Sequence, residues 1–99
     1  MSQEQKISSQ LVTQYFNIEF SEDNLTNQLI FDRLKKQIQY LLDHDFQTLL
    51  NALYRIDVDE QKFSEALEKS EPDQVSNAVA TLIWDRIILK AQTRLKYSL

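Results

Sequence analysis

Residues 75–91 read VSNAVATLIWDRIILKA, and eleven of these seventeen residues are apolar. A helix that touches its own core on one side needs only three or four apolar positions per two turns. The length of the segment, its lack of turn residues and the preceding Ser70 and Pro72 favour a helix over a buried strand. Either this helix lies centrally among other helices, or one face serves the core while another meets a second molecule.

Upstream, apolar residues recur at three- and four-residue spacing, the period of an amphipathic helix. The pattern contains no long repeat and no low-complexity linker. We therefore predict an all-α fold, a small bundle of four to five helices with short capped connections, in a single domain over residues 1–99. The expected helices cover residues 2–17, 24–43 and 46–56, a short segment from Asp57 to about Leu67, and residues 70–96.

Residues that cap helices stand at the expected boundaries. The Ser2–Gln5 pattern is typical of a capping box, and the Asp57–Glu60 pattern resembles one at the start of the fourth helix. Ser21 or Asp23 is placed to cap the second helix. The chain contains no glycine. Because each boundary has a capping residue or a proline, we expect the chain to change direction without left-handed turns.

The composition excludes several classes of chemistry. The 99 residues include no glycine, no cysteine and one histidine. Glycine-rich nucleotide loops, nucleophile elbows and calcium loops need glycine at fixed positions. Thiolate metal sites, disulfides and thiol nucleophiles need cysteine. We therefore expect a non-enzymatic protein with no cofactor and no metal site.

Targeting and membrane signals are also missing from the sequence. Residues 1–10 are polar and lack the apolar segment of a signal peptide. Asp85 and Arg86 interrupt the apolar stretch 75–91, which falls short of the roughly 20 residues that span a bilayer. The sequence thus predicts a cytoplasmic protein that does not enter a membrane.

Two clusters of titratable residues invite a chemical interpretation. His44 lies between two aspartates, but neighbouring residues on a helix do not face the same way, and capping explains the acids more simply. Asp57, Asp59 and Glu60 lack the further oxygen ligands and the glycine of a calcium loop. We interpret them as acids at a helix start, where they interact favourably with the helix dipole. Arg55 is placed to form an ion pair with Asp57.

The surplus apolar surface of the last helix supports an interaction role. Residues 57–73 carry seven acids and two bases, and residues 74–99 carry four bases and one acid, so an acidic and a basic segment can attract each other within one chain or between two. We expect docking to a protein partner or self-association, with a homodimer as the commonest form. The competing interpretation places Trp84 in the core of a monomer. The predicted partner-binding residues are Ala80, Trp84, Ile88, Ala91, Leu95 and Tyr97.

The alternative is a nucleic-acid-associated accessory protein. Arg86, Lys90 and Arg94 recur every four residues and line one stripe of the last helix, and Lys96 follows. Such a stripe can contact phosphates. However, cations near a helix C-terminus are favoured by the dipole in any case, and a net charge of −4 opposes nonspecific binding to nucleic acid.

Two segments resemble those of a family of short bacterial all-helical proteins. They are LYRIDVDE, residues 53–60, and KAQTRLKY, residues 90–97, and the resemblance covers roughly the last half of the chain. It implies a stand-alone helical domain. The family has no assigned activity, so the resemblance implies no functional residues.

Overall fold

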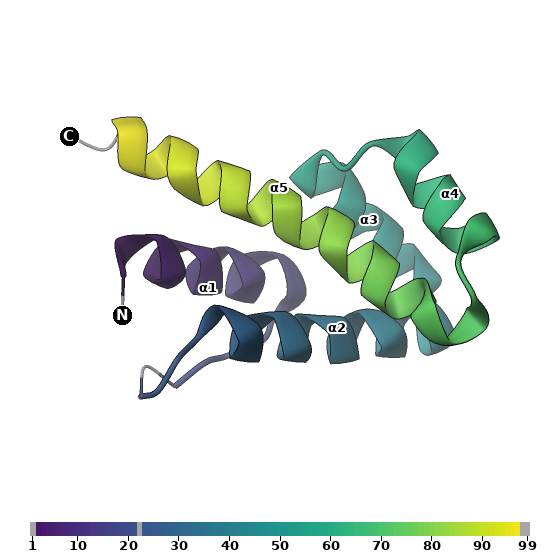
Figure 1. The fold of residues 1–99 in the computed structure, drawn as a ribbon, viewed down its shortest axis with the longest axis horizontal. Coiled ribbons are helices and arrows are strands. Elements are labelled where there is room, and N and C mark those ends of the chain that lie inside the picture. The colour runs from purple at the N-terminus through teal and green to yellow at the C-terminus, as the bar shows by residue number, and fades with distance from the viewer. Residues whose placement is uncertain (1, 22, 98–99) are drawn as a thin grey trace.

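The computed structural model describes residues 2–21 and 23–97. These residues form five α-helices and no strand, which confirms the predicted all-α bundle (Figure 1). In chain order the elements are α1 (Gln3–Phe16), α2 (Asn27–His44), α3 (Phe46–Ile56), α4 (Glu60–Lys69), the 3-10 turn η1 (Pro72–Gln74) and α5 (Val75–Tyr97).

The last helix is the centre of the bundle. α5 packs against α1, α2, α3 and α4, and Figure 1 shows it running diagonally across the other helices. Its 23 residues span about 35 Å, close to the 41 Å longest dimension of the molecule. α5 thus contacts every other helix of its own chain, while Thr81, Asp85 and Leu89 leave one stripe of it exposed.

The many apolar residues of α5 pack against other helices on more than one side of α5. Val79, Ile83 and Ile87 are fully buried in the middle of the core. A second set, which includes Leu82 and Trp84, is partly buried and packs against the same cluster. Because different helices cover different sides of α5, this helix needs apolar residues over more of its circumference than a helix at the edge of a bundle does.

The other helices contribute the remainder of one contiguous core. Each presents a face of apolar residues at helical spacing, and these faces pack against α5. The fully or nearly fully buried apolar side chains outside α5 are Leu11, Val12, Phe16, Ile18, Leu25, Ile30, Leu34, Ile38, Leu41, Leu49, Ala52, Leu53, Ile56, Phe63 and Ala66.

The capping predictions are confirmed at the first helix and wrong at two others. Both hydrogen bonds of the Ser2–Gln5 capping box are present, at 3.1 and 3.2 Å. The second helix begins later than predicted and is capped by Thr26, not by Ser21 or Asp23. The fourth is capped by Asp59, whose carboxylate accepts the N–H of Lys62 at 3.0 Å, and not by Asp57.

The expectation that the chain avoids left-handed turns is also wrong. Asn17, Asn24 and Asp57 have φ values of 57°, 59° and 69°. At Asp57 the chain closes α3 in a Schellman motif, because the N–H of Val58 donates to the carbonyl of Leu53 at 3.1 Å. Short Asn and Asp side chains tolerate this region better than most residues, so they serve here where glycine is usual.

No helix in residues 2–21 and 23–97 has both the length and the hydropathy that crossing a membrane would demand.

Candidate functional site

A groove lies between α3 and α4. Its volume is about 1000 Å³. It exists because the backbone of α3 lies close to α1, α2 and α5, whereas the backbone of α4 lies close to α5 and not to α3. The two helices therefore form a V whose vertex is the turn at Asp57–Asp59. We call this surface the α3–α4 groove.

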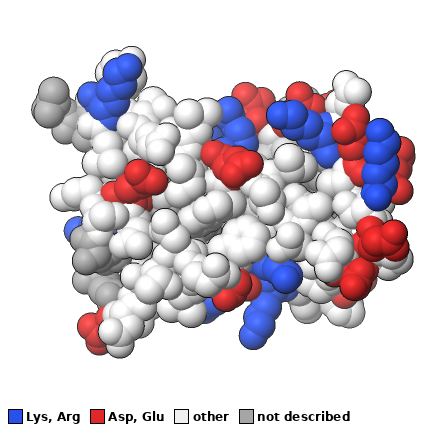
Figure 2. Space-filling view, in the orientation of Figure 1, with Lys and Arg blue, Asp and Glu red and all other residues white. Residues whose placement is uncertain are grey.

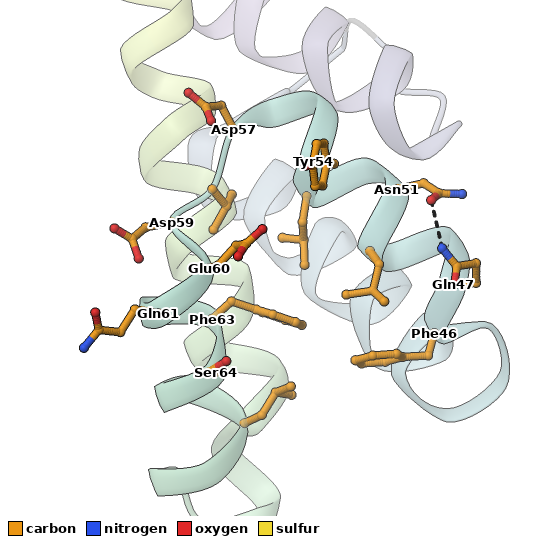
Figure 3. Close-up of a pocket in the computed structure, with 14 residues that line it drawn as sticks. Phe46, Gln47, Asn51, Tyr54, Asp57, Asp59, Glu60, Gln61, Phe63 and Ser64 are labelled. Atoms are coloured by element: carbon orange, nitrogen blue, oxygen red, sulfur yellow. Dashed lines mark hydrogen bonds between the residues drawn. The ribbon is translucent and has the colours of Figure 1, made fainter.

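The floor of the groove is apolar. In Figure 3 the rings of Phe46 and Phe63 point toward each other from the two walls, and their centroids are 6.1 Å apart in a stacked arrangement. Phe46 stays 40% exposed and Tyr54 82% exposed, so both aromatic side chains are accessible from solvent. The remaining apolar lining residues are Leu50, Leu53, Val58 and Leu67.

The charge along the groove has one sign. Fourteen residues line it, and among them are the acids Asp57, Asp59 and Glu60 but no Lys, Arg or His. Figure 3 shows the Glu60 side chain directed toward α3, while Asp57, Asp59 and Gln61 point away from the groove. The acids lie at the vertex of the V, and the Phe46–Phe63 pair lies farther along it, so one end is negative and the other apolar.

The predicted partner-binding residues of α5 do not form one accessible surface. Ala80 and Ala91 are fully buried, and this corrects their assignment, because helices of the same chain already cover them. Trp84 is half-buried and its ring meets that of Phe31 edge-on at 6.3 Å, as the monomer-core interpretation expects. Ile88 and Leu95 are half-buried as well. Of the six residues only Tyr97 is well exposed, at 74%.

Three of the four residues of the predicted basic stripe meet at one depression of the surface. Arg86 pairs with Asp57 at 3.8 Å. Lys90 and Arg94 line a shallow depression of about 360 Å³ beside Tyr15, and Arg86 reaches the same depression. Lys96 lies beyond it, with its ammonium group 5.6 Å from the centre of the Tyr97 ring.

The side chains of Arg55 and His44, near the two charged clusters, each contact a tyrosine ring. Arg55 does not pair with Asp57 but lies over the Tyr15 ring, 5.2 Å from its centre, and the partner of Asp57 is Arg86. His44 is exposed and contacts the ring of Tyr40 at 4.8 Å. Within the described part of the chain, no group of three His, Cys, Asp or Glu residues is arranged to hold a metal ion.

The α3–α4 groove was not among the predicted sites. The sequence contains one indication of the groove, since residues 46–56 place apolar or aromatic side chains at seven of eleven positions, more than one core contact needs. Periodicity assigns Phe46 and Tyr54 to the core because it does not indicate how far a neighbouring helix covers a face. That coverage is set here by the packing of α4 against α5.

Comparison of the chain with known protein families, with curated proteins and with solved structures finds no match. The resemblance of residues 53–60 and 90–97 to short bacterial helical proteins therefore stays a prediction.

Proposed function

We propose that this protein is a non-enzymatic interaction module that holds a helical segment of a partner protein in the α3–α4 groove. The observation that carries the proposal is the accessible apolar floor of the groove between two helices that diverge from a common turn. Apolar side chains exposed together in a concave surface are typical of protein-binding sites. The proposal keeps the interaction role inferred from the sequence and moves the contact from α5 to α3 and α4.

The dimensions of the groove suit a short helix. α3 has 11 residues and α4 has 10, so each wall is about 15 Å long. A partner helix of two to three turns would fit this length and would present apolar residues at i, i+4 and i+7 to the floor. Phe46 and Tyr54 supply the aromatic surface that often contributes most to binding energy at such interfaces.

Nucleic-acid binding, the alternative, has less support. Arg86 is already engaged by Asp57, and the depression formed with Lys90 and Arg94 is shallow. Figure 2 shows charged side chains of both signs over the α4 end of this face and a largely uncharged middle, with no continuous basic band. A phosphate backbone requires several cations along a track.

The test begins with a phage-displayed library of helical peptides selected against the immobilised protein. Affinities of selected peptides are then measured by fluorescence anisotropy for the wild-type protein and for Tyr54→Ala. Tyr54 is 82% exposed, so its loss should leave stability almost unchanged and weaken binding by about tenfold if it anchors the partner.

The matched control is Tyr40→Ala on α2. Tyr40 is also exposed, at 56%, but does not line the groove. Equal affinity of wild type, Tyr54→Ala and Tyr40→Ala for every selected peptide would contradict the proposed site. So would a library that yields no binder.

A further inference from the structure

The shape of the α3–α4 groove indicates a helical partner. The charge of its lining residues indicates which charge that helix carries. A groove that bound any apolar helix would need no particular charge along its edge. Here three acids and no base stand among the lining residues. They are concentrated at the vertex of the V, around the turn that joins α3 to α4.

The acids at the vertex differ in whether they form a hydrogen bond or an ion pair within the chain. The carboxylate of Asp59 accepts the N–H of Lys62 and so serves the start of α4. Glu60 lies in the first turn of α4, and neither Glu60 nor Asp59 forms an ion pair with a cation of the described residues. The Glu60 side chain is exposed and directed toward α3, so its charge lies at the edge of the groove (Figure 3).

The same turn already binds one cation from a helix. Arg86 of α5 approaches the carboxylate of Asp57 at 3.8 Å from the side opposite the groove, while 87% of the Asp57 side chain remains exposed. The turn therefore accepts a guanidinium group presented by a helix, although the Asp57 carboxylate itself points away from the groove (Figure 3).

Resting on the proposed function, we infer that the partner segment is a basic amphipathic helix. Its apolar residues contact the Phe46–Phe63 end of the groove, and a Lys or Arg near one end of the helix lies beside Glu60. The opposite signs of groove and helix would also exclude acidic helices of similar hydropathy, because like charges in an interface are costly.

The experiment uses three fluorescein-labelled peptides that share the same leucines at i, i+4 and i+7. They carry Lys, Gln or Glu, respectively, at the positions that flank the apolar face. Anisotropy titrations with the 99-residue protein should give affinities in the order Lys, Gln, Glu, with roughly a tenfold difference between the first and last. The Lys peptide alone should bind more weakly as NaCl is raised from about 50 to about 500 mM.

A pair of matched variants tests the role of Glu60. Glu60→Gln should weaken binding of the Lys peptide by about two- to fivefold, the range for one accessible ion pair, and should leave the Gln peptide unaffected. Glu68→Gln removes an exposed acid of the same helix that does not line the groove, and it should change neither affinity. Thermal unfolding of both variants checks that α4 is intact.

The possible failures are distinguishable. If all three peptides bind equally and Tyr54→Ala weakens them all, the groove binds helices without regard to charge, and the inference is wrong while the proposed function stands. If none of the three peptides binds and the helical-peptide selection also yields no binder, both the inference and the proposed function are wrong. If sedimentation shows a dimer that Glu60→Gln dissociates, the occupant is a second copy of this chain and the inference is overturned.

Discussion

Replacing Ile83 with alanine removes three carbon atoms from the centre of the core. Ile83 is fully buried near the middle of α5, the helix that all the others contact. At about 0.8 kcal/mol for each buried carbon group, the lost burial amounts to about 2.4 kcal/mol. The cavity that remains adds to this, so we expect the free energy of unfolding to fall by about 3 kcal/mol.

The control lies on the same helix. Leu89 is 48% exposed, so Leu89→Ala should cost less than about 1.5 kcal/mol. Both values are obtained from urea denaturation followed by far-UV circular dichroism, with the slope of the transition unchanged. A cost below about 1 kcal/mol for Ile83→Ala would refute the central position of α5. A wild-type midpoint that rises with protein concentration would show that burial depends on a second molecule.

Three further predictions concern the helix ends and the single tryptophan. Asp59→Ala removes the cap of α4 and should lower the free energy of unfolding by about 1 kcal/mol in urea denaturation, whereas Glu68→Ala should change it by less than about 0.5 kcal/mol. Asn17→Ala should cost about 1 kcal/mol because φ is 57° there, and Asn17→Gly should cost less, a ranking that thermal melts can check. The fluorescence emission maximum of Trp84 should be the same in dilute and concentrated samples, since the ring packs against Phe31 of its own chain; a blue shift on concentration would contradict this.

The helices were predictable because their apolar periodicity is strong and local. Residues such as Leu34, Ile38 and Leu41 recur at three- and four-residue spacing, and each is buried. The capping box of Ser2 and Gln5 was also predictable, since its two hydrogen bonds join residues that are three apart in the sequence. Both kinds of signal are set within a few residues of the chain.

Other features were not predictable from local sequence. By sequence, either Asp57 or Asp59 could cap the N-terminus of α4. Asp59 does so because Asp57 is the left-handed residue of the Schellman motif that ends α3. The burial of Ala80 and Ala91 depends on which helices pack onto α5. The accessibility of Tyr54 depends on how far α4 lies from α3. Each is decided by tertiary packing, which periodicity does not encode.

The central functional claim is that the α3–α4 groove, and not the C-terminal part of α5, is the surface that binds a partner. A ¹H–¹⁵N correlation spectrum of the labelled protein, recorded during titration with the Lys peptide, tests it most directly. We expect the largest shift changes on residues that line the groove, above all Phe46, Tyr54, Glu60 and Phe63. Changes confined to Tyr15, Lys90, Arg94 and Tyr97 would contradict it.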